Sequence, residues 1–386
     1  MTDASIASSA RGIATPAAAA ASPSRSRICV FLHDLRGGGA ERNTLRLVEG
    51  MIRSGRNVDL VLVTASGAFM NSIPAGTRVI DLKKKRVLQS IFAFVRYLKR
   101  ERPTSVLASL HHINLASIIA VRLSGVNTNL VICEHNQITQ KISHARGFFS
   151  RLTYRAVKVL YPFADDIIAV SQGVADDLVA FAGLKENAVK VVYNPVYQES
   201  MHEKAAAAPS HPWFLAREVP TLLAMGRLHT QKGFDILLHA FKQVRSTTPC
   251  RLVIVGEGDE RRDLTALSEQ LGLTDDVSFP GFIQNPFALM SRADLFVMSS
   301  RWEGLPTVLI EALACGATIV STDCPSGPRE ILDNGRYGTL VPTNDADALA
   351  EAMLQALSAP RKSHSERAKD FSDTASVSRY LEVLEN

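Results

Sequence analysis

The stretch S-S-R-W-E-G-L-P-T-V-L-I-E-A-L-A-C-G, residues 299–316, carries two glutamates, Glu303 and Glu311, eight positions apart. Pro306 suits the first position of a helix and Gly316 its end, which predicts a loop with Glu303 followed by a helix with Glu311. At ~1.5 Å per residue, Glu311 lies roughly 7–8 Å from the helix start, where free backbone N–H groups attract anions. Two acids around an anion site suit an elongated ligand that contains phosphate. The alternative is a capped amphipathic helix with a solvated Glu311.

The composition describes a chain that is too long for one hydrophobic core and lacks membrane-spanning or secretory features. Its 386 residues predict two domains, and no uncharged apolar run approaches the length of a transmembrane helix. Five cysteines without a C-x-x-C pair indicate reduced thiols in the cytoplasm and argue against a zinc site. Residues 1–26 are rich in Ala and Ser, and we expect a disordered tail there rather than a targeting segment.

The net charge of +5 hides a division between the two halves of the chain. Residues 27–200 carry 23 Lys and Arg against 13 Asp and Glu, a net charge of +10. Residues 201–386 carry 18 against 24, a net charge of −6. Halves of opposite charge predict different partners, and we expect the basic half to lie near an anionic surface.

Both halves alternate apolar strands with helices, and each begins with a strand, a glycine loop and a helix. The loops are R-G-G-G-A-E-R at residues 36–42 and G-R-L-H-T-Q-K-G at residues 226–233. This order predicts an α/β protein with two doubly wound parallel sheets, whose ligand sites lie at the carboxyl ends of the strands. The first loop lacks G-x-G-x-x-G, which argues against a nicotinamide dinucleotide, and glycines that serve only a tight turn are the alternative.

The expected domains are residues 27–200 and 213–372, joined by a linker over residues 201–212, where A-A-A-A-P-S-H-P occurs. The expected strands are residues 28–32, 58–63, 78–81, 105–109, 130–133, 166–171 and 188–194 in the first half, and 221–225, 251–259 with its loop, 277–282, 294–298, 318–322 and 339–341 in the second.

A basic amphipathic segment begins with K-K-K-R at residues 83–86 and continues to residue 102. Two interpretations stay open: the helix lies on an anionic bilayer, or it packs on the sheet and exposes its charges to water. A second basic stretch, residues 144–158, has no recognised nucleic-acid motif, so we expect no nucleic-acid partner. The predicted location is the cytoplasm, with membrane contact at its cytoplasmic face under the first interpretation.

Arg227 and Lys232 lie in a loop that follows a predicted strand, so we expect them at the same edge of the second sheet as Glu303 and Glu311. A planar guanidinium and a point charge together suit a diphosphate, with ordinary surface charge as the alternative. No D-x-D lies in a ligand-binding loop, so we expect these cations and the helix start, without a metal, to stabilise a phosphate leaving group. Phosphate-binding elements between the two acids favour a nucleotide-activated sugar over simple glycoside hydrolysis, with Glu303 facing the sugar and Glu311 the ribose.

Histidines follow two of the predicted strands, at the edge where α/β sheets bind ligands. His135 comes directly after an apolar strand and is flanked by Glu134 and Asn136, which makes it the candidate for the site. We interpret His111 and His112 as ordinary polar residues at a strand end.

Four motifs carry a resemblance to a known family: G-G-G-A-E-R, G-R-L-x-x-x-K-G, V-G-E-G and E-G-L-P-x-x-x-x-E-A-x-A-C-G. They resemble the retaining, GT-B-fold glycosyltransferases of family 4, and the likeness runs from residue 27 to the C-terminus. The resemblance implies two Rossmann-like domains that face a central cleft. It also implies that the last helix, residues 373–386, packs back on the first domain.

The resemblance also implies roles for single residues. Glu303 and His135 are the catalytic candidates, although the histidine stands in E-H-N where H-D is commoner in the family. Gly38 and Gly39 belong to the acceptor side, near the diphosphate. The implied donor-binding residues are Gly226, Arg227, Lys232, Gly256, Phe282, Gly304, Leu305, Pro306, Thr307 and Glu311.

The run D-C-P-S-G-P-R-E-I-L at residues 323–332 resembles bacterial members that build lipid-linked or polysaccharide glycans. This implies transfer of a hexose or N-acetylhexosamine with retention, from a nucleotide sugar to such an acceptor. UDP is the commonest nucleotide of the donor sugars in this group, and we expect no cofactor or metal. The alternatives are an inactive scaffold that binds nucleotide sugars and a GT-B-fold sugar-nucleotide epimerase or phosphorylase.

Overall fold

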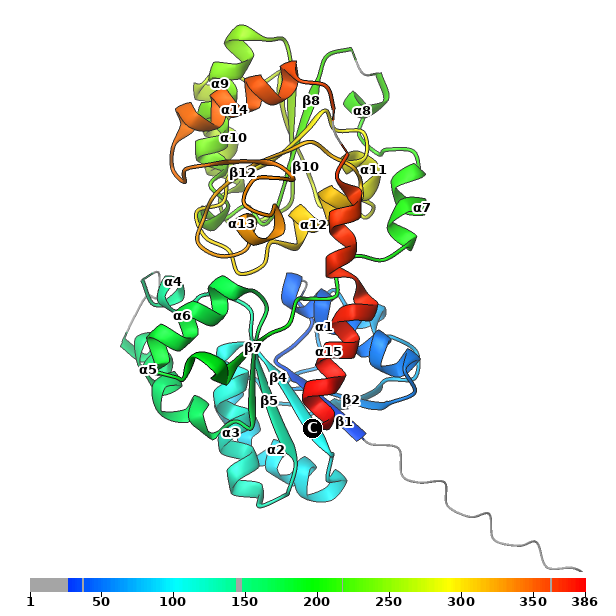
Figure 1. The fold of residues 1–386 in the computed structure, drawn as a ribbon, viewed down its shortest axis with the longest axis vertical. Helices are drawn as coiled ribbons and strands as arrows, with labels where there is room; N and C mark the ends of the chain where they lie inside the picture. The colour runs from blue at the N-terminus through cyan, green and yellow to red at the C-terminus, as the bar shows by residue number, and fades with distance from the viewer. Residues whose placement is uncertain (1–26, 37, 144–147, 217, 362) are drawn as a thin grey trace, which may run out of the picture.

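Runs of apolar residues form the strands of two parallel sheets, and one domain is built around each sheet (Figure 1). The computed structural model describes residues 27–386 apart from 37, 144–147, 217 and 362. The first sheet has the strand order β3-β2-β1-β4-β5-β6-β7, and the second has the order β10-β9-β8-β11-β12-β13. Both orders reverse beside the first strand of the domain, so the prediction of two doubly wound sheets is confirmed. The expected tail, residues 1–26, lies outside the described residues.

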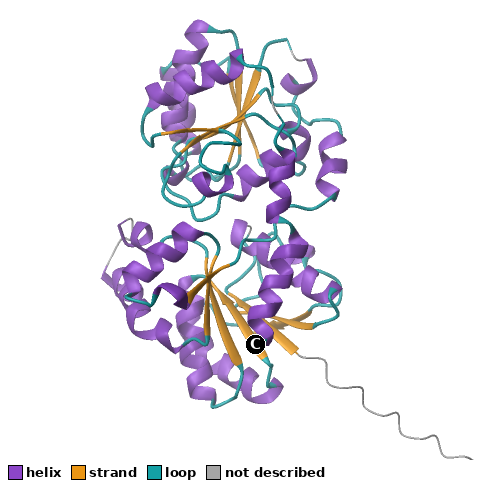
Figure 2. Ribbon diagram, in the orientation of Figure 1, coloured by secondary structure: helices purple, strands orange, loops and turns teal. Residues whose placement is uncertain are grey.

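The central strands are buried along nearly their whole length because helices cover both sides of each sheet, as Figure 2 shows, whereas the strands at the sheet edges are partly exposed. The first sheet contains β1 (Arg27–Leu32), β2 (Asn57–Leu62), β3 (Arg78–Asp81), β4 (Ser105–Ser109), β5 (Asn129–Glu134), β6 (Asp166–Ala169) and β7 (Val189–Val191). The second contains β8 (Thr221–Met225), β9 (Arg251–Val255), β10 (Val277–Gly281), β11 (Leu295–Met298), β12 (Ile319–Thr322) and β13 (Thr339–Val341).

The helices connect successive strands. Those of the first domain are α1 (Gly39–Arg53), α2 (Val87–Glu101), α3 (His111–Ser124), α4 (Ile138–Ser143), α5 (Phe148–Leu160) and α6 (Gln172–Ala182). The second part of the chain contains α7 (Ser200–Ala206), α8 (Trp213–Ala216), α9 (Phe234–Thr247), α10 (Arg261–Gln270), α11 (Phe287–Met290), α12 (Thr307–Ala314), α13 (Pro328–Ile331), α14 (Ala346–Ser358) and α15 (Asp373–Glu385). None of the described helices combines the length and apolar character that a bilayer span requires.

The chain crosses between the domains twice, and the two crossing segments lie against each other. The amides of Val196 and Tyr197 donate to the carbonyl of Phe371 at 3.2 and 3.0 Å. The amide of Asp373 donates back to the carbonyl of Tyr197 at 3.1 Å. Most of α7 lies inside the expected linker, residues 201–212, where it forms a helix packed on α11 of the second domain.

The last helix, α15, lies against the first sheet although it follows the second domain in sequence (Figure 1). Asn129 Nδ2 donates to the carbonyl of Val383 at 3.0 Å, and the Ser105 hydroxyl donates to the carbonyl of Leu384. The buried Tyr380 hydroxyl lies 3.4 Å from the sulfur of Cys133, which is a free thiol like the other four cysteines. These contacts tie the two domains together at the end of the chain.

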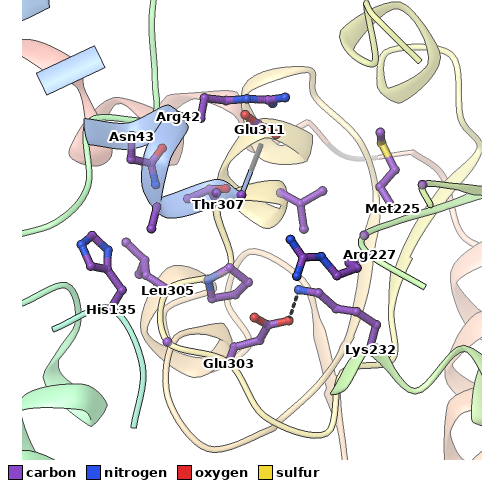
Figure 3. A pocket seen from close by; sticks show the side chains of 18 of the residues that line it. Arg42, Asn43, His135, Met225, Arg227, Lys232, Glu303, Leu305, Thr307 and Glu311 are labelled. Atoms are coloured by element: carbon purple, nitrogen blue, oxygen red, sulfur yellow. Dashed lines mark hydrogen bonds and ion pairs between the residues drawn. The ribbon is translucent and has the colours of Figure 1, made fainter. Parts of the chain in front are cut away.

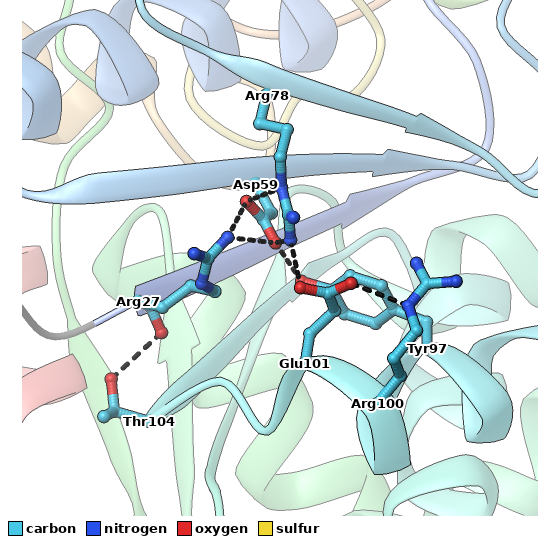
Figure 4. A network of polar contacts seen from close by, with 7 residues as sticks. All are labelled: Arg27, Asp59, Arg78, Tyr97, Arg100, Glu101 and Thr104. Carbon is cyan, nitrogen blue, oxygen red and sulfur yellow. Dashed lines mark hydrogen bonds and ion pairs between the residues drawn. The ribbon is translucent and has the colours of Figure 1, made fainter. Parts of the chain in front are cut away.

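A buried carboxylate, Asp59 of β2, is the centre of a polar network in the first domain (Figure 4). It accepts hydrogen bonds from Arg27 Nη1 at 3.0 Å and from Arg78 Nε at 2.8 Å. The hydroxyl of Tyr97 donates another at 2.7 Å, and Arg78 also donates to Glu101 at 2.7 Å. A carboxylate that is 1% exposed is stable in the interior only with such partners.

We expect Asp59→Ala to lower the free energy of unfolding by about 2–4 kcal/mol, because the buried Tyr97 hydroxyl and two guanidinium groups lose their acceptor. Glu101→Ala removes only the more exposed partner of Arg78 and is expected to cost less than about 1 kcal/mol. Urea denaturation of both variants measures the difference. Equal losses would contradict a central role for Asp59.

Candidate active site

Glu303 lies in the loop between β11 and α12, and its carboxylate is held by three side chains. The residue is 6% exposed. Lys232 Nζ lies 2.6 Å from Oε1, and the Ser300 hydroxyl donates to the same oxygen at 2.6 Å. Gln231 Nε2 donates to Oε2 at 3.4 Å. These contacts fix the orientation of the carboxylate at the wall of a pocket between the domains.

The loop after β8 brings two cations to the same wall. The amide of Gly226 donates to the carbonyl of Val255 at 3.0 Å. Gly256 follows with φ +142°, and a Cβ on it would lie 1.9 Å from the oxygen of Gly226. Only glycine tolerates both the backbone angle and the contact, so the loops after β8 and β9 pack directly together. Arg227 then projects into the pocket beside Lys232 (Figure 3).

Helix α12 begins at Thr307, one residue later than Pro306 suggests. Pro306 has ψ 91°, which is extended backbone, so it is the N-cap rather than the first helical residue. No side chain caps this end of the helix. The amide of Leu309 donates to the carbonyl of Pro306 at 3.0 Å, so an anion at the pocket wall would meet the amides of Thr307 and Val308. Glu311 follows one turn later and is 6% exposed, and Arg46 Nη2 of α1 lies 3.5 Å from its Oε1.

His135 directly follows β5 on the first-domain wall of the pocket. Burial lowers the pKa of His135 to about 4, so the ring is neutral at pH 7. Its Nε2 has no hydrogen-bond partner among the described residues. The neighbouring Glu134 is enclosed in the domain core, where Asn114 Nδ2 donates to it at 3.0 Å and the Tyr161 hydroxyl donates as well. Burial raises the pKa of Glu134 to about 7.

The two walls touch at Gly304. A Cβ on this residue would lie 1.9 Å from the carbonyl oxygen of His135, so only glycine allows the contact. Glu303 and His135 therefore lie on either side of a direct contact between the domains, and both line the pocket.

Every predicted site residue lines this one pocket, which has a volume of about 650 Å³. Figure 3 shows Arg227 and Lys232 across the pocket from His135 and Asn43. The predicted residues brought together are Gly38, Gly39, His135, Gly226, Arg227, Lys232, Gly256, Phe282, Glu303, Gly304, Leu305, Pro306, Thr307 and Glu311. Their roles stay predictions. No cluster of His, Cys, Asp and Glu suited to a metal ion occurs in the described parts of the chain.

Several residues that shape the site were not predicted. Gln231 and Ser300 hold Glu303, and Arg46 contacts Glu311 from the other domain. Lys141 of α4 lies close enough for the charges of Arg227 and Glu303 to act on its pKa, which burial lowers. Gln231 and Ser300 lie within stretches that the sequence analysis singled out, but at positions without an assigned role, and Arg46 and Lys141 lie in no motif. The contacts of second-domain site residues with α1 and α4 depend on how the two domains meet, which the sequence does not show.

The histidines at the start of α3 lie beside the pocket rather than on its lining. The rings of His111 and His112 lie 5.1 Å apart, and His111 stacks on Tyr154 at 4.4 Å. Burial lowers the pKa of His111 to about 3 and that of His112 to about 4.

Comparisons with known proteins match both domains. A family model described as "Glycosyltransferase Family 4" matches residues 37–200, and one described as "Glycosyl transferases group 1" matches residues 211–375. The chain is 28% identical over 355 residues to the N-acetylgalactosamine-N,N'-diacetylbacillosaminyl-diphospho-undecaprenol 4-alpha-N-acetylgalactosaminyltransferase of Campylobacter jejuni, covering 89% of this chain and 94% of the relative. It is 26% identical to the amylovoran biosynthesis glycosyltransferase AmsD of Erwinia amylovora, covering 78% of this chain and 81% of the relative.

Solved structures show the same fold. Anabaena Alr3699/HepE in complex with UDP-glucose superposes with a TM-score of 0.78 at 20% identity, covering 94% of this chain and all of the other. The lipopolysaccharide outer core galactosyltransferase WaaB superposes with a TM-score of 0.73 at 20% identity, covering 93% of this chain and 99% of the other. Two Rossmann-like domains around a central pocket define a GT-B protein. The chain belongs to the family 4, group 1 glycosyltransferases and is a glycosyltransferase.

The burial of His135 predicts a loss of stability at low pH. Its folded pKa of about 4 lies below the unfolded value of about 6.5, so the unfolded state binds more protons between these values. Stability is complete above pH 6.5 and falls as the pH drops toward 4. We expect His135→Gln to reduce the fall between pH 7 and pH 5 by about 1–2 kcal/mol.

Urea denaturation of the wild type and His135→Gln at both pH values measures this difference. Identical pH dependence in the two proteins would show that His135 is not buried as a neutral ring. His111 and His112 contribute equally to both proteins and cancel in the comparison.

Proposed function

We propose that the protein transfers a hexose or N-acetylhexosamine, with retention, from a UDP-sugar to a lipid-linked or polysaccharide acceptor. The observation that carries the proposal is the fixed Glu303 carboxylate, which shares one pocket with two cations, a helix start and His135. A nucleotide sugar has matching parts: a sugar for Glu303 and a diphosphate for the cations and the helix start. The pocket volume of about 650 Å³ suits a ligand of that size.

In this proposal the second domain holds the donor. Arg227, Lys232 and the first turn of α12 bind the diphosphate, and they stabilise the charge on the leaving phosphate without a metal or other cofactor. Glu311 accepts hydrogen bonds from the ribose hydroxyls, and Glu303 accepts one from a sugar hydroxyl. The UDP-glucose complex of the Anabaena neighbour supports a UDP donor by fold similarity.

The proposed reaction takes place on one face of the sugar. The bond between the anomeric carbon and the phosphate oxygen breaks, and the acceptor oxygen bonds to the same carbon from the same side. The acceptor proton passes to the departing phosphate. Neutral His135 lies at this wall and adds no positive charge at pH 7, and its Nε2 is buried without a hydrogen-bond partner among the described residues.

The acceptor enters from the basic first domain. The name of the Campylobacter relative specifies an undecaprenol diphosphate-linked acceptor, and AmsD is named for amylovoran biosynthesis. Both names support an acceptor built on a lipid diphosphate or a growing polysaccharide. Gly39 leaves space for it at the start of α1, since a Cβ there would have no atom within 4 Å, whereas the Glu41 carboxylate lies beside Gly38.

A thermal-shift screen of UDP-, GDP- and ADP-sugars tests the donor. A ligand at 100 times its dissociation constant stabilises the folded state by about 2.7 kcal/mol, so the correct donor gives a clear shift. We expect UDP-sugars to give the largest shift. Equal shifts for all three bases would contradict the choice of UDP.

Activity variants test the site itself. We expect Glu303→Ala and Lys232→Ala each to lower transfer by more than about 100-fold, because both remove charge placed for the transition state. Circular dichroism checks that the fold is intact, and Glu366→Ala on the exposed surface is the matched control.

Unchanged turnover in both site variants would contradict the proposal. Donor binding without release of UDP would instead indicate a scaffold, and an altered sugar that remains attached to UDP would indicate an epimerase.

We also propose that the first domain binds an anionic membrane surface through α2, α3 and α5. Nine large apolar side chains are exposed among the described residues, and six of them lie on these helices or in the turn that follows α5: Leu88, Phe92, Leu123, Leu152, Val159 and Phe163. On α2, Leu88 is 77% and Phe92 is 74% exposed, while Phe94 and Leu98 pack on the sheet. The helix thus both packs on the sheet and presents an outward apolar pair flanked by basic residues.

We expect the double variant Leu88→Glu/Phe92→Glu to weaken binding to phosphatidylglycerol-containing vesicles at least about tenfold, because it replaces two membrane-facing apolar side chains with acids. Sedimentation with vesicles measures the effect. Leu215→Glu on α8 is the matched control, since Leu215 is 63% exposed in the second domain. Equal binding by wild type and double variant would refute this surface.

A further inference from the structure

We propose that Ser171, Gln172, Ser326 and Glu330 form an interdomain brace that positions the donor-sugar loop, residues 303–307, against the first domain. The proposal rests on the proposed function, because it gives these residues a part in sugar transfer. They lie at the start of α6 in the first domain and around α13 in the second, outside the lining of the donor pocket.

The first half of the brace is a pair of serines that share one carbonyl. Ser171 is fully buried, and its hydroxyl oxygen lies 3.0 Å from the carbonyl oxygen of Gly304. Ser326 approaches the same oxygen at 2.7 Å, and the two hydroxyls lie 2.7 Å apart. Each hydroxyl can donate one hydrogen bond. If one serine donates to the other, the second serine donates to the carbonyl of Gly304; otherwise both donate to that carbonyl. The donor loop is therefore held from both domains.

The second half is a carboxylate from one domain at the start of a helix from the other. The amide of Gln172, the first residue of α6, donates to both oxygens of Glu330 at 3.1 and 3.0 Å. The Tyr193 hydroxyl donates to Glu330 at 2.7 Å. A negative charge at the amino end of an 11-residue helix is stabilised by its free N–H groups. Glu330 thus fixes the direction of α6 relative to the second domain.

The brace acts at the residue where the two walls of the pocket meet. Gly304 follows Glu303 directly, and its backbone abuts the carbonyl of His135. Holding Gly304 therefore sets the separation of the Glu303 carboxylate from the His135 ring. Arg227 and Lys232, which bind the diphosphate in the proposed function, both lie in the second domain. Loss of the brace is thus expected to affect the chemical step more than donor binding.

Kinetics of donor cleavage test this division of roles. With UDP-glucose and UDP-N-acetylglucosamine as probes, we expect Ser171→Ala and Glu330→Gln to lower kcat about tenfold, as loss of one net hydrogen bond in the transition state does. Donor KM is expected to change less than about twofold, because the diphosphate contacts are intact.

A matched control separates positioning from simple helix capping. Ser171 also accepts a hydrogen bond from the amide of Val174 at 3.3 Å, so its replacement removes the cap of α6. Asp345→Ala removes the equivalent cap of α14, where Asp345 accepts from Ala348 at 2.9 Å, away from the first domain. Both variants are expected to lower Tm, and only Ser171→Ala to lower kcat. A kcat within twofold of wild type in both brace variants, or an equal loss in Asp345→Ala, would overturn the proposal.

A cross-link tests the brace without any substrate. The hydroxyls of Ser171 and Ser326 are close enough that thiols at both positions can reach the S–S bond length of about 2.05 Å. We expect Ser171→Cys/Ser326→Cys to form one interdomain disulfide with oxidised glutathione, identified by mass spectrometry, with wild type as the control for native thiols. Introduced thiols that remain free would overturn the brace. If the double variant cross-links and the wild-type protein cleaves neither probe, the proposed donor chemistry is refuted and the brace contact stands.

Discussion

The contact between Gly304 and the backbone of His135 is the constraint around which the pocket is arranged. Parallel strands in both sheets end at the same gap, so the loops that follow them must meet there. At Gly304 they meet without space for a Cβ, which would lie 1.9 Å from the oxygen of His135. Glu303 therefore has a fixed position relative to the first domain, although no side chain of that domain bonds to its carboxylate among the described residues.

A second tie between the domains depends on Arg46. Its guanidinium donates to the carbonyl of Val196 in the crossing segment at 3.3 Å and lies 3.5 Å from the Glu311 carboxylate. One partly buried side chain of α1 thus links the crossing segment, the first domain and α12. Burial lowers the pKa of Arg46, while the charge of Glu311 acts in the opposite direction. The position of Glu311 is accordingly sensitive to how the domains are placed, as is that of Glu303.

The strands and the two doubly wound sheets could be predicted from the sequence because local signals specify them, whereas most of the predicted pocket residues came from the resemblance to a known family. Apolar runs mark strands covered on both faces, and glycines mark the loops that pack together. Contacts between distant segments carry no such signal: Arg46 and Glu311 are 265 positions apart. The linker prediction rested on the alanine and proline content of residues 201–212, yet alanine also favours helices, and Met201 is buried on α7's inner side. Pro306 suited a first helical residue, but its extended backbone makes it the cap.

The pocket is not a simple basic cavity, despite the net charge of the first half. Its charged lining consists of Arg42, Arg227 and Lys232 against Glu41, Glu257, Glu303 and Glu311. Lys232 is paired with Glu303, whereas no ion pair of Arg227 occurs among the described residues. On the proposed function, a diphosphate is then best placed between Arg227 and the first turn of α12, where positive potential is not already neutralised. That placement directs the sugar toward Glu303 and the ribose toward Glu311. On the proposed function, the specific placement of charge, rather than its total, sets the orientation of the donor.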